Sequence, residues 1–124
     1  MGDKVRLSTE LIERDGVPIV RVHGEIDLHT APEFERALRA GMERRTPALI
    51  VDLSDISYVD SSGLSALLAA NKELSARNAA LYVAAPPGRP GVRRVIEITR
   101  LDTVIRVRDT VEDILDEFGR REAA

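Results

Sequence analysis

A short segment rich in hydroxyl and carboxyl groups is the part of this sequence best suited to chemistry. Its residues are Tyr58-Val59-Asp60-Ser61-Ser62-Gly63-Leu64, between an apolar strand pattern and an apolar helix pattern. Asp60, Ser61 and Ser62 are therefore expected at a helix start, where unpaired N–H groups and the positive end of the helix dipole tolerate added negative charge. Aspartate and serine are also preferred N-cap residues, so the segment by itself fits both a plain helix cap and a regulated serine.

A second polar segment, Gly24-Glu25-Ile26-Asp27-Leu28-His29, follows another predicted strand. In sheets with parallel strands, sites form where loops leave the carboxyl ends of the strands. If the two strands are close in the sheet, Asp27 lies at the same end of the domain as Asp60 and Ser61.

These residues fit catalytic chemistry poorly. A serine nucleophile needs a neighbouring base, but His23 follows a strand alternation that faces solvent, and no nucleophile-elbow sequence surrounds Ser61. His29, in the second segment, is harder to dismiss. Asp27 and Asp60 could bind a metal or form a phosphoaspartate, but no third acid is clearly placed beside them. A small α/β enzyme that uses these two aspartates and the serine therefore stays open as an alternative.

Length and composition exclude several other function classes. The 124 residues fit one domain, 1–124, with an ordered core of about 5–118 and a frayed tail at 119–124. A net charge of −3 with scattered Lys and Arg argues against nucleic acid as the main partner. There is no cysteine, no phosphate-binding glycine loop, and no apolar run of about 18 residues that could span a membrane. We therefore expect a cytoplasmic protein with no cofactor, no metal and no membrane contact.

The remaining pattern predicts an opening hairpin followed by alternating helices and strands. Asp15-Gly16 is a strong hairpin-turn signal. Thr30 is expected to cap the first helix with Glu33 at the capping-box position, and Asp109 to cap the last one with Glu112. The predicted elements are strands 5–13 and 17–22, a helix after residue 30, strand 48–53, helix 61–77, strand 80–85, helix 92–99, strand 104–107 and a helix after residue 109. This order predicts an α/β fold with a mixed sheet of about five strands.

Four stretches together resemble a STAS domain, and specifically a bacterial anti-sigma factor antagonist. They are Gly24-Glu25-Ile26-Asp27-Leu28-His29-Thr30-Ala31, Val51-Asp52-Leu53-Ser54, Tyr58-Val59-Asp60-Ser61-Ser62-Gly63-Leu64-Ser65-Ala66-Leu67-Leu68 and Val92-Arg93-Arg94-Val95-Ile96-Glu97-Ile98-Thr99-Arg100-Leu101-Asp102. They cover almost the whole chain in the family's order. The resemblance implies a mixed sheet with about four helices mostly on one face.

The resemblance also implies a phosphorylation switch. In this family the unphosphorylated protein binds an anti-sigma factor that is a serine kinase, and a sigma factor is thereby freed. The partner binds ATP and phosphorylates the serine after the aspartate, which is Ser61 here, and a phosphoserine phosphatase resets the switch. The family's loop aspartate corresponds to Asp27. The residues expected to bind the partner are Asp27, His29, Thr30, Asp60, Ser61, Ser62, Gly63 and Leu64.

One position departs from the family pattern, and one alternative stays within the family. Arg100 stands where relatives often carry glycine, and a left-handed conformation there would cost an arginine about 1 kcal/mol. The alternative is a STAS subunit of another assembly, such as a lipid-transport or stressosome-like complex.

Overall fold

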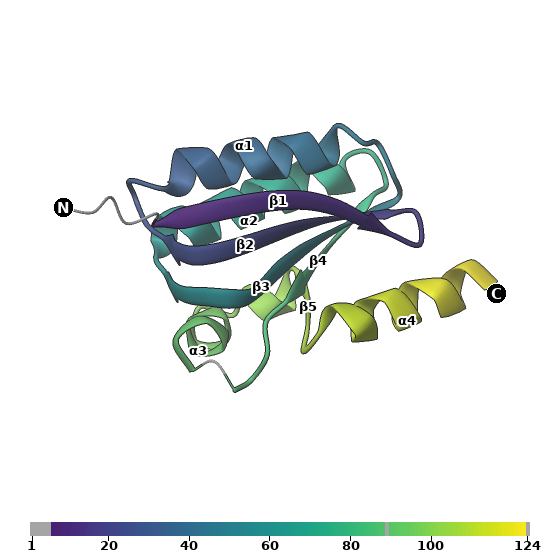
Figure 1. The fold of residues 1–124 in the computed structure, drawn as a ribbon. Helices are drawn as coiled ribbons and strands as arrows, with labels where there is room; N and C mark the ends of the chain where they lie inside the picture. The colour runs from purple at the N-terminus through teal and green to yellow at the C-terminus, as the bar shows by residue number, and fades with distance from the viewer. Residues whose placement is uncertain (1–5, 89, 124) are drawn as a thin grey trace.

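A five-stranded sheet with helices on both faces forms the described part of the chain, which is residues 6–88 and 90–123 of a computed structural model (Figure 1). The elements in chain order are β1 (Leu7–Arg14), β2 (Val17–Ile26), α1 (Ala31–Met42), β3 (Ala48–Val59), α2 (Ser61–Ser75), β4 (Ala80–Ala84), α3 (Pro90–Ile98), the 3₁₀-helix η1 (Leu101–Thr103), β5 (Arg106–Arg108) and α4 (Val111–Ala123).

The strands lie in the order β1-β2-β3-β4-β5. β1 and β2 are antiparallel, and the other neighbouring pairs are parallel. This confirms the predicted mixed sheet with an opening hairpin. Because β2 and β3 are parallel neighbours, both strands end at the same edge of the sheet, where the two polar segments follow them.

The hairpin turn sets the position of the chain before β1. Asp15 and Gly16 both have positive φ angles, 53° and 80°, as the central residues of a type I′ hairpin turn require. The register runs without interruption from the pair Arg14 and Val17 to the pair Leu7 and Gly24.

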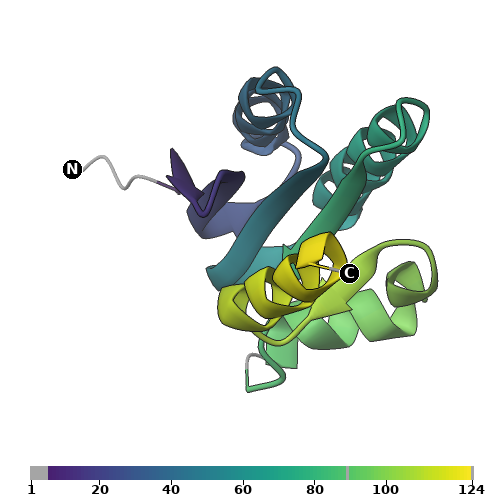
Figure 2. The same cartoon turned by 90° about the vertical axis from the view of Figure 1, so that its right-hand side faces the viewer.

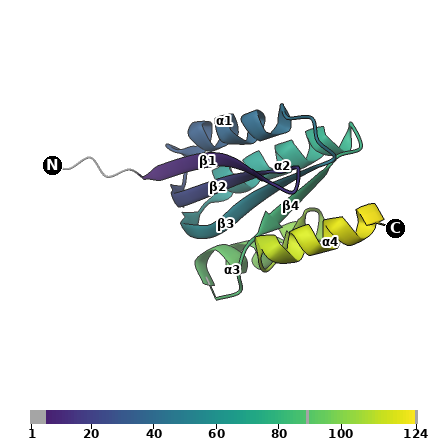
Figure 3. The ribbon, with the colours of Figure 1, turned by 45° about the vertical axis from the view of Figure 1, so that its right-hand side comes forward.

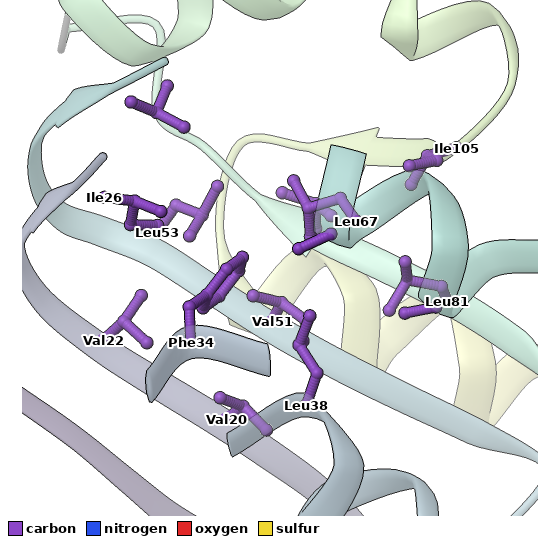
Figure 4. Close-up of a cluster of buried hydrophobic side chains, with 14 of the residues drawn as sticks. Val20, Val22, Ile26, Phe34, Leu38, Val51, Leu53, Leu67, Leu81 and Ile105 are labelled. Atoms are coloured by element: carbon purple, nitrogen blue, oxygen red, sulfur yellow. The ribbon is translucent and has the colours of Figure 1, made fainter. Parts of the chain in front are cut away.

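The helices divide unequally between the two faces of the sheet. α1 and α2 lie on the same side of the sheet (Figure 2). Their side chains, among them Phe34, Leu38 and Leu67, belong to the larger core cluster (Figure 4). The buried residues of α3 belong to the same cluster. α4 lies along the opposite face, where Ile114 and Ile50 belong to a second cluster (Figure 3). The expected placement of the helices, mostly on one face, is thus confirmed.

Two strands are longer than the sequence pattern predicted. β2 continues past residue 22 to Ile26, and β3 continues past residue 53 to Val59. Gly24 was interpreted as the start of a loop, but its φ of +116° is accommodated within the strand at a register shift. A Cβ at Gly24 would clash with the Arg6 carbonyl oxygen, so the lack of a side chain allows this close approach.

Both predicted capping boxes are wrong. The Thr30 side chain makes no cap hydrogen bond, because it turns back into the preceding loop. At the last helix Thr110, and not Asp109, accepts the hydrogen bond from the backbone N–H of Asp113, at 3.0 Å.

Other element ends also differ from the prediction. α2 ends at Ser75, and α3 runs over Pro90–Ile98. The last strand covers Arg106–Arg108 and starts later than predicted, because the backbone N–H groups of Val104 and Ile105 donate to the Leu101 carbonyl in the turn that follows η1. α4 runs over Val111–Ala123; the expected fraying of residues 119–124 stays a prediction, and residue 124 lies outside the described residues.

Candidate functional site

The two polar segments meet where β2 and β3 end. Ile26 and Val59, the last residues of these strands, are paired in the sheet register. The backbone N–H of Asp60 donates to the Ile26 carbonyl oxygen at 3.1 Å, which fastens the start of α2 to the end of β2. The predicted placement of Asp27, Asp60 and Ser61 at one end of the domain is therefore confirmed.

Asp60 is the N-cap of α2. Its backbone is extended, with φ −113°, and its Oδ1 accepts from the Ser62 backbone N–H at 2.8 Å. This hydrogen bond occupies one carboxylate oxygen and stabilises the first turn of a 15-residue helix. Asp60 therefore has a structural function, whatever else it does.

Ser61 is the first residue of α2 and is exposed. Within residues 6–88 and 90–123 its hydroxyl makes no hydrogen bond. A group attached to this oxygen would extend into solvent beside the positive end of the helix dipole. Ser62, next to it, is half-buried, and its backbone is held by Asp60.

Gly63 and Leu64 pack the base of the site. A Cβ on Gly63 would lie 2.7 Å from the Cγ2 atoms of both Ile26 and Val59, so only glycine allows α2 to approach the strand ends this closely. Leu64 is 8% exposed and belongs to the main core. Burial gives both residues a packing function, and their contact with a partner stays a prediction.

Asp27 organises the second segment. Its Oδ1 accepts from the backbone N–H groups of His29 at 2.9 Å and Thr30 at 3.0 Å. The Thr30 hydroxyl accepts from the Asp27 N–H and donates to the Glu25 carbonyl, both at 2.9 Å. Thr30 is buried, whereas the side chains of Leu28 and His29 are exposed.

Arg6 was missed by the sequence analysis, although the hairpin could have located it. The uninterrupted pairing after the two-residue turn puts Arg6 level with Glu25. Its guanidinium forms ion pairs with Asp27 and, at 3.4 Å, with Glu25. Arg6 thus ties the start of β1 to the candidate site.

The environment keeps Asp27 ionised. Desolvation by its surroundings raises the pKa of this carboxyl, but the hydrogen bonds from the Thr30 and His29 amides, together with the Arg6 charge, outweigh it and hold the pKa below its ordinary value. Negative charge at this end of the sheet is therefore present throughout the neutral range.

The described residues contain neither a cluster suited to a metal ion nor a helix suited to a membrane. No group of three His, Asp or Glu side chains among residues 6–88 and 90–123 is arranged to hold a metal ion. Over the same residues, none of the helices has the length and apolar character needed to cross a membrane.

Comparisons with known proteins agree with this fold. The sequence matches the STAS domain family over residues 8–114. A Listeria monocytogenes protein named anti-sigma-B factor antagonist is 35% identical over 106 residues, 85% of this chain and 91% of that protein. A Staphylococcus aureus protein of the same name is 32% identical over 108 residues, 87% of this chain and 98% of that protein. The crystal structure of an anti-sigma factor antagonist from Mycobacterium paratuberculosis superimposes with a TM-score of 0.78 and 34% identity, covering 90% and 92% of the two chains.

Proposed function

This chain belongs to the STAS domain family, and from that premise we propose that it is an anti-sigma factor antagonist switched off by phosphorylation of Ser61. The observation that carries the proposal is the exposed Ser61 hydroxyl on the first turn of a capped helix, beside the rigid Asp27 loop. Relatives named as antagonists span most of the chain and support the same function.

The partner in this proposal is an anti-sigma factor with serine kinase activity. In its unphosphorylated form the chain binds this partner, and a sigma factor is released in the cytoplasm. The partner supplies ATP, so the chain needs no cofactor of its own. A phosphoserine phosphatase returns the chain to the binding form.

The site is suited to accepting a phosphate without unfolding. The Ser61 hydroxyl makes no contact within the described residues that a phosphate would break, and the helix start favours added negative charge. The α2 cap is provided by Asp60, so phosphorylation leaves the capping hydrogen bond in place.

The same phosphate would prevent binding. It adds a charge of about −1.5 to −2 at pH 7, next to Asp60 and close to the ionised Asp27. A partner surface packed on neutral Ser61 would have to bury a bulky dianion without a paired cation, at a cost of several kcal/mol. Release then follows from local repulsion and desolvation, with little change of the backbone.

The enzyme alternative is less well supported by these contacts. Asp60 caps α2, and both carboxylate oxygens of Asp27 are engaged by the loop and by Arg6. The Ser61 hydroxyl has no basic side chain hydrogen-bonded to it among the described residues. The alternative of another STAS assembly is disfavoured by the antagonist names of the relatives.

The test is phosphorylation by candidate anti-sigma factor kinases of the source organism, purified and incubated with the chain and ATP. Mass spectrometry should show one added phosphate on Ser61 in the wild-type chain and in Ser62→Ala, the matched control. Ser61→Ala should stay unmodified, yet bind the kinase and unfold at the same urea concentration. Full phosphorylation of Ser61→Ala would contradict the assignment of the site.

A further inference from the structure

Leu28 is the most exposed large hydrophobic side chain in the described part of the protein. The residue is 71% exposed, although the neighbouring residues of the loop are buried or hydrogen-bonded to one another. A single exposed leucine needs no explanation by itself. Here, however, the structure of the loop around Leu28 suggests a reason for its exposure.

The loop holds Leu28 in a fixed position. Asp27 and Thr30, on either side of it, exchange hydrogen bonds, and Arg6 holds the Asp27 carboxylate from the start of β1. The Thr30 hydroxyl also donates to Glu25, which closes the base of the loop. A leucine presented on a rigid loop loses little conformational entropy when it is buried by a partner, which is what makes an efficient binding anchor.

The surroundings of Leu28 indicate the chemistry of the surface that would cover it. Leu28 lies two residues after Ile26, whose carbonyl accepts the hydrogen bond from Asp60 next to Ser61. The carboxylates of Glu25 and Asp27 are both paired with Arg6, and the backbone of Asp60 is hydrogen-bonded to the end of the strand that precedes Asp27. Two carboxylates share one cation here, so the part of a complementary surface that faces Glu25 and Asp27 carries basic side chains, whereas the part packed on Ser61 does not.

We propose that Leu28 is the apolar anchor of this chain for its anti-sigma factor, inserting into an apolar pocket of the partner bordered by basic side chains. The inference rests on the proposed function and adds a residue to it. Ser61 then acts as the switch, and Leu28 supplies binding energy and specificity that phosphorylation of Ser61 overrides.

The experiment measures binding of the purified kinase of the source organism by titration calorimetry, with Leu28→Ala as the test variant. Truncation of an anchor should weaken binding about tenfold or more. Leu28→Met keeps the volume and apolar character and should bind within about threefold of the wild type. Both variants should unfold at the wild-type urea concentration, because the side chain is exposed.

Val104 offers a matched control, since it is an exposed β-branched residue far from the site. The residue is 56% exposed, and it precedes β5 in the chain. Arg106 of β5 is level with Ile50 of β3, because both residues are paired with the same residue of β4. Ile50 precedes Val59 by nine residues of β3, which at about 3.3 Å per residue is roughly 30 Å of strand. Val104→Ala should leave binding unchanged.

The outcomes separate this inference from the proposed function. If the wild-type chain binds and Leu28→Ala binds equally well, the anchor is wrong and the antagonist function stands. If Val104→Ala weakens binding as much as Leu28→Ala, the effect is not specific to the loop and the anchor is again wrong. If the wild-type chain binds none of the candidate kinases, the proposed function is overturned, and the anchor with it.

Discussion

Replacing Gly63 with alanine should destabilise the protein by about 1–2 kcal/mol, although alanine is the better helix former. Gly63 is in the first turn of α2, two residues after Ser61, and faces the paired ends of β2 and β3. The substitution therefore tests the packing that brings the two polar segments together.

The magnitude follows from the geometry. The added Cβ would lie 2.7 Å from the Cγ2 atoms of both Ile26 and Val59, and carbon atoms that close must move apart. Ile26 is fully buried and Val59 is 4% exposed, so neither can turn into solvent. Overpacking of this kind costs about 1–3 kcal/mol, and the helix propensity of alanine returns about 0.5–1 kcal/mol of it.

The assay is urea unfolding of the wild type and of two glycine variants. Gly119→Ala is the control, because Gly119 is also helical but a Cβ there would meet nothing within 4 Å. It should be neutral or stabilising by about 0.5 kcal/mol. Gly63→Ala should have a free energy of unfolding about 1–2 kcal/mol below that of the wild type.

A Gly63→Ala variant as stable as Gly119→Ala would refute this reasoning. It would show that Ile26 and Val59 move aside at little cost, and that close packing of α2 on the strand ends does not hold the site in place.

Three further substitutions test individual contacts. Asp60→Ala removes the α2 cap and should cost about 1 kcal/mol in urea unfolding, whereas Asp60→Ser should retain most of the stability. Asp27→Asn should be less stable than wild type at pH 7. Because the folded-state pKa of Asp27 is lowered, its contribution to stability is complete above the ordinary value of 3.8 and is lost as the pH falls through the folded-state pKa. The difference between the two proteins should therefore shrink as the pH is lowered below 3.8. Arg100 has a φ of 60°, so Arg100→Gly should raise the free energy of unfolding by about 1 kcal/mol, and an unchanged value would mean that the left-handed conformation is not strained.

The overall architecture was predictable because the periodicity and turn signals agree with it. Asp15-Gly16 located the hairpin, and the buried strand pattern after residue 48 located the central strand. Arg100 stands where relatives often carry glycine, and it does adopt the left-handed conformation, whose cost to arginine stays a prediction. Each of these signals lies within a few neighbouring residues, so it can be recognised in the sequence without knowledge of the fold.

The details of the site depend on contacts between distant segments, which a periodic pattern does not contain. Gly24 was interpreted as the start of a loop, but it lies within β2, where the lack of a Cβ allows both its positive φ and the close approach of the Arg6 backbone. Thr30 has the residue type of a helix cap, but the Asp27 loop offers its hydroxyl better partners. The hydrogen bonds that close this loop leave Leu28 exposed, and the residue type alone would not have predicted that exposure.

The most direct test of the proposed switch is the affinity of the anti-sigma factor kinase for the chain before and after stoichiometric phosphorylation of Ser61. The account predicts that phosphorylation weakens binding about 100-fold or more, with amide shifts confined to residues 24–30 and 58–68. Equal binding by the two forms would contradict the switch, and amide shifts spread over α4 and the sheet would replace local repulsion with a conformational mechanism.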